Sequence, residues 1–367
     1  MSAVSVELPL WKIGVCAIVA ALIAYFVTPH VKTLAERLDA MDIPKDGRRI
    51  HDHPIPRMGG LAIYIGFVLS VILFVTPNKQ VMGLLLGATI IVAMGILDDV
   101  ICLSPWLKLG GQFLAAYTVI RCGVVFDTLS LYVGGVRTPV EIGFLSVPLT
   151  FLWIVMCTNA VNLIDGLDGL AAGVSTISSL SLLAVSLILP MTYLSAGVPL
   201  ILACLSGSCI GFIPYNRNPA KIFMGDTGSQ FLGFVLAVVS TMGLFKYHAI
   251  IAMLSLAFPL IDTVFAFLRR ILHGQSPFHP DRGHIHHRLL DLGLSQKQVV
   301  AVLCGLSAIL GLFAILIACT GRLRIVCLVA ALIIFGIVLS IFGRNAKAHA
   351  AEHARDCVSE DGSESAP

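Results

Sequence analysis

Long runs of apolar residues recur along the whole chain, and they constrain its fold more than any other feature. The hydrocarbon core of a bilayer is about 30 Å thick, and an α-helix needs roughly 20 apolar residues to cross it. Eleven stretches approach or meet this length: residues 8–28, 59–76, 81–97, 107–125, 144–161, 170–189, 197–214, 229–244, 249–268, 299–318 and 324–342. Because apolar residues follow one another in these runs without alternating with polar ones, the runs predict helices rather than barrel strands. The expected fold class is all-α, a polytopic integral membrane helical bundle with about 10–11 transmembrane helices.

A low content of charged residues limits the classes of function. Asp, Glu, Lys and Arg make up 12% of the chain, about half of the roughly 25% that is typical of a soluble domain. The net charge of +3 comes from scattered residues, so we expect membrane lipids as partners and no nucleic acid. The ten cysteines include no C-x-x-C pair, which excludes a disulfide scaffold and a thiolate zinc site.

The basic residues predict how the bundle is oriented. If the N-terminus lies outside, one set of loops together with the tail holds 17 of the 24 Lys and Arg residues, and the opposite set holds six. Cytoplasmic loops carry the excess of such residues, so we expect a multi-pass protein of the inner (plasma) membrane with its C-terminus inside. The first span is too long for a signal-peptide core, and we expect it to be retained. Residues 1–343 are expected to form one transmembrane domain with cytoplasmic functional loops, followed by a disordered tail over 344–367.

Four groups of polar residues fall on the cytoplasmic side of this predicted bundle. The first is Asp98 and Asp99, which end the third span, where the helix dipole disfavours an anion. Two adjacent carboxylates there need a cation, and Lys108, Mg²⁺ or proton uptake could supply it. Such a pair suits metal coordination or proton transfer. Taken alone, it is equally compatible with two aspartates that only mark the water boundary.

The second group joins the fifth and sixth spans. Asn162, Asp165 and Asp168 follow one another at intervals of three, which keeps their side chains on one broad face of a helical turn. Gly166 and Gly169 would allow a ligand or another backbone to approach closely. Capping of the sixth helix would explain one of these aspartates, but it would not explain both together with Asn162.

The third group lies just ahead of the eighth span and includes Asn216, Lys221 and Asp226. A helix N-terminus offers unpaired N–H groups and the positive end of a dipole, which favour a phosphate. Asp226 could hold an accompanying Mg²⁺, and Lys221 would be a point charge for the same phosphate. Helix capping by Asp, Thr or Ser is the simpler alternative for this segment.

The fourth group is a cationic segment between the ninth and tenth spans. Asp281 is expected to cap a short helix that ends at Gly293, with an apolar stripe lying on the membrane interface. The stripe consists of Ile285, Leu289 and Leu292. The polar side then carries Arg282, His284, His286, His287 and Arg288. These residues suit an anion better than zinc. The other three groups offer hard oxygen ligands, which zinc does not prefer, and guanidinium groups can donate two parallel hydrogen bonds to phosphate oxygens.

Taken together, the four groups describe a pocket at the membrane edge with carboxylates for Mg²⁺, amides for a neutral group and cations for phosphates. Phosphoryl transfer requires positioning and charge neutralisation more than covalent chemistry, so it suits this set. The location favours one lipid substrate and one soluble substrate, such as a lipid phosphate and a nucleoside diphosphate-sugar. A secondary transporter would place its acidic residues near the bilayer midplane, and a non-catalytic lipid-binding protein would not need four converging groups.

Five segments resemble those of the polyprenyl-phosphate N-acetylhexosamine-1-phosphate transferases, in the order typical of that family. They are Pro54–Gly60, Asp98–Lys108, Asn162–Gly169, Phe223–Ser229 and Pro280–Arg288. The resemblance implies a Mg²⁺-dependent phosphotransferase, with Mn²⁺ as a substitute metal, whose active site is cytoplasmic. It implies transfer of a sugar 1-phosphate from a UDP-sugar to undecaprenyl phosphate with release of UMP, the first step of an envelope polysaccharide such as O-antigen or teichoic acid.

The resemblance also implies roles for individual residues. Asp226 would bind Mg²⁺ with Asp98 beside it, and Asp98 would act as base toward the lipid phosphate. The further catalytic residues would be Asp99, Asp165, Asp168 and His284. The substrate-binding residues would be Lys108, Asn162, Asn216, Lys221, Arg282, His286, His287 and Arg288.

The histidine segment also bears on the sugar. Its order His-Ile-His-His resembles the branch that uses UDP-N-acetylglucosamine. The phospho-N-acetylmuramoyl-pentapeptide transferases, the runner-up branch, usually carry three consecutive histidines. The sequence leaves open whether Asp98 positions the lipid phosphate, removes its proton or forms a covalent intermediate with the donor. It also leaves open which polymer receives the lipid product and whether the protein is a homodimer.

Overall fold

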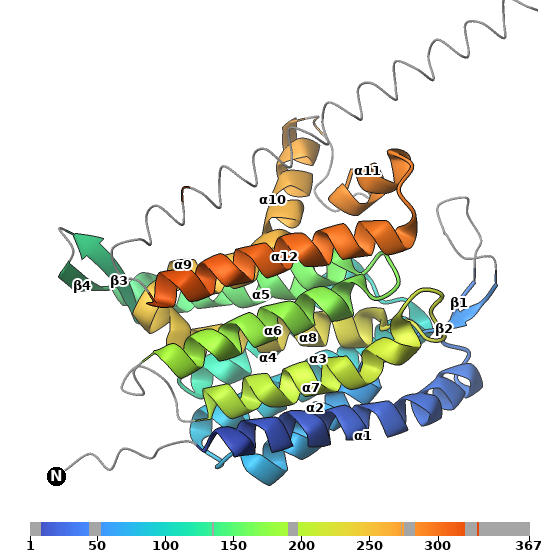
Figure 1. The fold of residues 1–367 in the computed structure, drawn as a ribbon, viewed down its shortest axis with the longest axis horizontal. Coiled ribbons are helices and arrows are strands. Elements are labelled where there is room, and N and C mark those ends of the chain that lie inside the picture. The colour runs from blue at the N-terminus through green and yellow to red at the C-terminus, as the bar shows by residue number, and fades with distance from the viewer. Residues whose placement is uncertain are drawn as a thin grey trace, which may run out of the picture.

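Long α-helices run side by side in the computed structural model (Figure 1), which describes residues 9–43, 53–133, 136–189, 197–272, 274, 283–319 and 329. The helices are α1 (Leu10–Arg37), α2 (Gly60–Phe74), α3 (Lys79–Ile101), α4 (Pro105–Arg121), α5 (Ser146–Ile164), α6 (Leu170–Ile188), α7 (Val198–Asn216), α8 (Gly225–Val239), α9 (Phe245–Ser255), α10 (Ala257–Leu272), α11 (Ile285–Asp291) and α12 (Gln296–Cys319). A 3₁₀ turn over Gly143–Leu145 leads into α5, and a π-helical turn over Ser240–Leu244 joins α8 to α9. The all-α membrane bundle expected from the sequence is confirmed.

Each predicted span up to residue 318 falls on a helix, except that span 229–244 runs from α8 into the π-helical turn and span 249–268 covers parts of both α9 and α10. Six helices of the described chain are long and apolar enough to cross a membrane by themselves, and α2, with 15 residues, is shorter. The shorter helices α4 and α8, of 17 and 15 residues, lie within the same bundle (Figure 1). The predicted span 324–342 and the predicted tail 344–367 lie outside the described residues, apart from residue 329.

The predicted span 249–268 is apolar enough to cross a membrane, but it is broken, because the chain bends there by 81° between α9 and α10. Pro259, in the first turn of α10, explains the break. A proline has no N–H to donate to the carbonyl four residues earlier, and its ring clashes with that carbonyl, which here belongs to Ser255, the last residue of α9. Helix α10 therefore leaves the bundle at a steep angle (Figure 1).

Helix α8 occupies the centre of the bundle, where residues Thr227 to Val239 are all buried. A helix that is apolar on every side is stable only in such surroundings, and small residues let its neighbours approach closely. A Cβ atom added at Gly95 would lie 2.4 Å from the Cα of Thr227. The contact at this glycine brings the end of α3, with Asp98 and Asp99, beside the start of α8.

Two short β-hairpins lie at opposite ends of the bundle (Figure 1). Strands β1 (Met41–Asp42) and β2 (Ile55–Pro56) pair antiparallel, with Asp42 opposite Ile55. Phe223, ahead of α8, donates its N–H to the carbonyl of Pro56 at 2.8 Å, so this hairpin is fixed to the α7–α8 loop. Strands β3 (Thr128–Val133) and β4 (Val136–Glu141) form the other hairpin, which the search for apolar runs did not predict.

Candidate active site

Three carboxylates meet where the end of α3 faces the start of α8. One oxygen each from Asp98, Asp99 and Asp226 lies within 4.8 Å of the others. The amine of Lys108, in the first turn of α4, lies between two of them, at 2.7 Å from Asp98 Oδ2 and 2.9 Å from Asp226 Oδ2. Lys108 is thus one of the cations that the aspartate pair was expected to need.

Asp99 has a further partner that the sequence did not indicate. Its carboxylate accepts hydrogen bonds from the backbone N–H groups of Asp226 and Thr227, at 3.0 and 3.1 Å, and from the Thr227 hydroxyl at 2.6 Å. These N–H groups belong to the first turn of α8, where a helix has unpaired donors and favours an anion. The unfavourable position of Asp99 at the end of α3 is therefore compensated by the N-terminus of α8.

Asp226 is held by neutral donors as well as by Lys108. Asn162 donates to its Oδ1 at 3.1 Å, and Gln230 donates to its Oδ2 at 2.8 Å. Behind Gln230, the buried amide of Gln112 donates to Gln230 Oε1 at 3.1 Å and accepts from Asn159 at 2.7 Å. Three side-chain amides therefore lead from the bundle interior to this one carboxylate.

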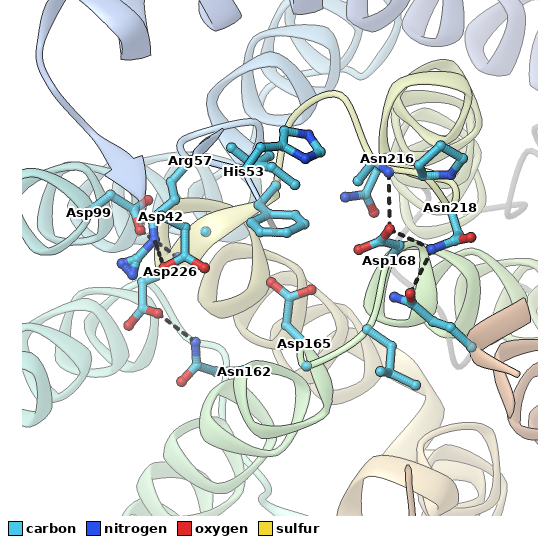
Figure 2. Close-up of a pocket in the computed structure, with 18 of the residues that line it drawn as sticks. Asp42, His53, Arg57, Asp99, Asn162, Asp165, Asp168, Asn216, Asn218 and Asp226 are labelled. Atoms are coloured by element: carbon cyan, nitrogen blue, oxygen red, sulfur yellow. Dashed lines mark hydrogen bonds and ion pairs between the residues drawn. The ribbon is translucent and has the colours of Figure 1, made fainter. Parts of the chain in front are cut away.

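A cavity of about 510 Å³ opens beside the cluster, within the size range of small-molecule sites. Figure 2 shows its lining, which comes mainly from the β1–β2 hairpin, the α5–α6 turn, the α7–α8 loop and the start of α8, with single residues from the ends of α3, α5 and α7, from α11 and from the start of α12. Among the described lining residues, five are aspartates and one is an arginine. The aspartates are Asp42, Asp99, Asp165, Asp168 and Asp226, and the arginine is Arg57. A phosphate-bearing ligand in this cavity would be repelled unless additional positive charge entered with it.

Asp165 projects into this cavity between the Asp226 group and the Asp168 group (Figure 2). Its carboxyl group has no hydrogen-bond partner among the residues that the structure describes. Burial, followed by the negative charges of Asp226 and Asp99, raises the pKa of Asp165 from about 3.8 to about 8. In the metal-free protein this side chain therefore holds its proton near neutral pH.

This raised pKa predicts how stability depends on pH. The folded protein keeps the Asp165 proton up to about pH 8, whereas the unfolded chain loses it near pH 4, so metal-free protein should lose stability between these values. Asp165→Asn removes the ionisable carboxyl group whose raised pKa causes this loss of stability. We expect the variant to melt at a higher temperature than wild type at pH 8 in chelator, with the difference shrinking toward pH 5.

Thermal unfolding in detergent would measure this effect, with Asp168→Asn as the matched control. The Asp168 carboxylate accepts hydrogen bonds from Asn218 Nδ2 at 2.9 Å and from the Ala220 N–H at 3.0 Å. Its replacement should lower the melting temperature at both pH values. An Asp165→Asn effect that is equal at pH 5 and pH 8 would contradict the assignment of the raised pKa.

Two residues expected to contact substrate also have structural roles. Asp168 holds the α7–α8 loop through the two bonds just described. The buried Asn216 accepts from the N–H of Gly169 at 3.1 Å and donates to the carbonyl of Ile222 at 3.1 Å. Both residues line the cavity, and their hydrogen bonds fix the loops that form its wall.

The expected cationic segment is only partly at the cavity. His287 lines it, whereas His284 and His286 are buried, and Arg288 is exposed away from the lining. Lys221 is likewise exposed and is not among the described lining residues. Arg282 and Asp281 lie outside the described residues. Burial, followed by the charge of His287, lowers the pKa of His286 to about 3, so His286 is neutral at physiological pH.

The predicted interfacial stripe of this segment is wrong. Helix α11 begins at Ile285 and ends at Asp291, and Leu289 is fully buried. The reason is that α11 packs on the start of α12 and lays His286 against Gly166 of the α5–α6 turn. A Cβ atom at Gly166 would lie 2.6 Å from His286 Nε2. The short helix therefore forms part of the rim of the cavity instead of lying on the bilayer.

Sequence reasoning did not select several residues of this site. Arg57, His53 and Asp42 reach the cavity from the β1–β2 hairpin, and Arg57 lies 3.8 Å from Asp42. Arg57 belongs to the segment Pro54–Gly60 that carries part of the family resemblance, so a signal for it was present. Asn218 offered no such signal, because its partners Asp168 and Gln296 come from distant parts of the chain. Gln230 stands one helical turn after Asp226, with which it bonds, and that spacing was a signal that the sequence reasoning did not use.

The residues present fit a hard divalent cation. Magnesium prefers carboxylate oxygens and keeps several of its waters, and the cluster offers such oxygens at the edge of a polar cavity. The hydrogen bonds to Asp99 come from the first turn of α8, two of them from its fixed backbone. Asp98 and Asp226 share the amine of Lys108, which stands at the end of a flexible side chain. Asp98 and Asp226 are therefore the carboxylates best suited to exchange Lys108 for a metal ion.

Comparisons with known proteins point in one direction. The model of the family described as Glycosyl transferase family 4 matches residues 81–244. A "Probable undecaprenyl-phosphate N-acetylglucosaminyl 1-phosphate transferase" of Bacillus subtilis is 41% identical over 314 residues, covering 83% of this chain and 85% of the relative. A "Decaprenyl-phosphate N-acetylglucosaminephosphotransferase" of Mycobacterium tuberculosis is 37% identical, with 80% of each chain covered. A "Phospho-N-acetylmuramoyl-pentapeptide-transferase" of Nostoc is 32% identical, covering 86% of this chain and 88% of the relative.

Proposed function

The chain belongs to the family of polyprenyl-phosphate N-acetylhexosamine-1-phosphate transferases, and from this premise we propose its reaction. It transfers N-acetylglucosamine 1-phosphate from UDP-N-acetylglucosamine to undecaprenyl phosphate and releases UMP. The observation that carries this proposal is the meeting of Asp98, Asp226 and Lys108 beside an acid-lined cavity of about 510 Å³. Carboxylates, an amine and amides in this arrangement suit the transfer of a phosphoryl group between two phosphorylated substrates.

The metal in this proposal is Mg²⁺, for which Mn²⁺ is expected to substitute. Asp226 and Asp98 would hold it, and it would neutralise charge on the donor diphosphate. Asp99 is less suited to that task, because its oxygens already accept hydrogen bonds from the first turn of α8.

The reaction itself requires one bond to form and one to break. An oxygen of the lipid phosphate attacks the phosphorus that bears the sugar, and the bond from that phosphorus to the UMP oxygen breaks. Asp98 faces the lipid phosphate and either takes its remaining proton or orients it, since a phosphate monoester is already largely ionised at pH 7. Lys108 supplies positive charge to the phosphates, and Asn162 keeps Asp226 in place.

The active site is proposed to face the cytoplasm. Helices α3, α5 and α7 end at the site, whereas α4, α6 and α8 begin there (Figure 1). The positive-inside rule assigns this end of the bundle to the cytoplasm. UDP-sugars would then reach the cavity from the cytosol, while the lipid phosphate would enter from the adjoining leaflet.

An exchange assay would test the proposed reaction. Purified protein, undecaprenyl phosphate, UDP-N-acetylglucosamine and radiolabelled UMP are expected to yield labelled UDP-N-acetylglucosamine, because the reaction runs in both directions through the same lipid diphosphate. Exchange should require the lipid. Label that appears without lipid would indicate a different acceptor, either another molecule or a carboxylate of the protein such as Asp98. A complete lack of exchange with active-site residues intact would reject the transferase.

The choice of donor is a separate expectation. His286 of α11 lies against Gly166 at the rim of the cavity, and we expect this closed rim to obstruct the peptide arm of UDP-N-acetylmuramoyl-pentapeptide, which N-acetylglucosamine lacks. We expect discrimination against the pentapeptide donor by at least roughly a thousandfold in kcat/KM, about 4 kcal/mol, because a steric clash costs more than a missing contact. Thin-layer separation of the lipid products from the two labelled donors would measure it, and efficient use of the pentapeptide donor would favour the runner-up branch.

A further inference from the structure

Helix α10 contacts the histidine segment through a buried carboxylate that the proposed reaction does not yet use. Asp262, 2% exposed, lies one turn beyond Pro259 in α10. Its Oδ2 lies 2.8 Å from Nδ1 of His284, which is also buried, and its Oδ1 accepts the backbone N–H of Ile285 at 2.9 Å. Ile285 is the first residue of α11, so a single side chain binds both the ring and the helix start.

A second contact follows two helical turns later on the same face of α10. Arg269 donates from Nη1 to the carbonyl of Gly283 at 2.8 Å. Ala266, between these two residues, is small and buried, and residues at i, i+4 and i+7 share one face of a helix. Helix α10 therefore holds the start of the histidine segment at two points, and the 81° bend after α9 gives α10 the direction that makes these contacts.

The Asp262 contact also selects a protonation form of His284. A carboxylate accepts hydrogen bonds, so His284 carries a proton on Nδ1 and donates it to Asp262. The His284 ring then stacks on the His286 ring, with centroids 5.7 Å apart and an angle of 10° between the planes. His286 in turn lies against Gly166, and His287, the next residue, lines the cavity.

We propose that Asp262 is a positioning residue for the transferase reaction, which acts by holding His284 in its Nδ1-protonated form and thereby fixes α11 at the rim of the cavity. This inference rests on the proposed function, since it concerns the placement of the histidine segment toward the donor diphosphate. Outer partners that orient a functional histidine typically alter activity or ligand affinity about 10- to 100-fold when they are replaced.

The substitution Asp262→Asn separates the two contacts of this side chain. The asparagine oxygen can still accept from the N–H of Ile285, whereas its NH₂ group would face Nδ1 of His284. The ring then gains a hydrogen bond only if its proton moves to Nε2. Asp262→Asn should thus reverse the tautomer of His284 while the start of α11 stays anchored, and Asp262→Ala should lose both contacts.

Nitrogen NMR of protein labelled with ¹⁵N-histidine would read the tautomer directly. The His284 signals are identified by their absence in His284→Gln. We expect an Nδ1-protonated ring in wild type and an Nε2-protonated ring in Asp262→Asn. An unchanged tautomer would overturn the proposal. Because this readout needs no turnover, it stays informative even if the exchange assay rejects the proposed reaction.

A double-mutant cycle would test whether Asp262 acts through His284. Alone, Asp262→Asn is expected to lower kcat about 10- to 100-fold, with a melting temperature close to that of wild type. In the His284→Gln background the same substitution should change kcat less than about twofold, because the residue through which Asp262 acts is gone. If the losses in kcat of the two single variants multiply in the double variant, Asp262 has an independent structural role, and the proposal is contradicted.

Two further variants complete the comparison. Asp262→Glu retains the carboxylate and is expected to recover part of the rate lost in Asp262→Asn. Asp291→Asn removes an exposed carboxylate at the last residue of α11 and should leave the exchange rate and the His284 tautomer as in wild type. Equal losses in Asp262→Asn and Asp291→Asn would show a general charge effect instead of positioning.

Discussion

Removal of divalent metal is expected to abolish sugar-phosphate transfer. Five aspartates and one arginine are found among the described residues that line the cavity, so a diphosphate donor would bring further negative charge to an already negative site. Lys108 alone offsets only part of this charge, because it already pairs with Asp98 and Asp226. After treatment with chelator and metal-free dialysis we expect no exchange above background, and Mg²⁺ or Mn²⁺ should restore it.

Binding of Mn²⁺, followed by its paramagnetic resonance, would provide a measurement independent of turnover. Asp226→Asn should weaken this binding, whereas Asp127→Asn, located at the opposite end of the bundle beside β3, serves as a matched control and should not. Full activity after exhaustive removal of metal would eliminate the metal from the mechanism. In that event, Asp226 would act only as the partner of Lys108, Asn162 and Gln230.

Asp98→Asn is expected to lower turnover by about 10² to 10⁴ if Asp98 is a general base. The asparagine keeps the size of the side chain and an oxygen for the N–H of Leu103, which Asp98 Oδ1 accepts at 2.8 Å. It cannot take a proton, and its NH₂ group would face the amine of Lys108. The initial rate of lipid-product formation, measured at saturating UDP-N-acetylglucosamine and Mg²⁺, gives this loss.

The pH dependence of the two rates distinguishes the roles of Asp98. If Asp98 takes a proton, the ratio of variant to wild-type rate should rise at higher pH, where the lipid phosphate loses its proton without help. If Asp98 only orients the phosphate, this ratio should stay constant. A near-normal rate in Asp98→Asn, at a metal affinity equal to that of wild type, would show that neither role is essential.

Hydropathy predicts most of this fold because a helix that crosses a bilayer must be long and apolar. The positions of α1 to α8 and α12 follow from that requirement alone. Pro259 lies within an apolar run and leaves its hydropathy high, so the bend between α9 and α10 was missed. The β3–β4 hairpin was not predicted, because its strands of six residues each are too short to stand out as long apolar runs.

The candidate site was predictable to the extent that its residues stand out locally. Aspartates at the ends of apolar runs are conspicuous, so Asp98, Asp165 and Asp226 could be selected from the sequence. Asp262 is also an acidic residue within an apolar run, but its partner His284 lies 22 residues further along the chain. The capping of α8 by Asp99 likewise depends on a contact between residues more than 120 positions apart.

The three amides behind Asp226 form a connected set of hydrogen bonds that fixes how each amide is oriented. Gln230 donates an N–H to Asp226, so its amide oxygen faces Gln112 and accepts a hydrogen bond from it. Gln112 accepts from Asn159 at 2.7 Å and donates back to Asn159 Oδ1 at 3.2 Å, and the second N–H of Asn159 reaches the carbonyl of Val155 at 2.8 Å. None of these amide groups can rotate by half a turn unless the others rotate too. Such a rotation would place the amide oxygen of Gln230 against the Asp226 carboxylate. The interior of the bundle thus imposes a polarity on the site, because it holds Gln230 with an N–H directed at Asp226 and so favours negative charge there even when Lys108 turns away toward a phosphate.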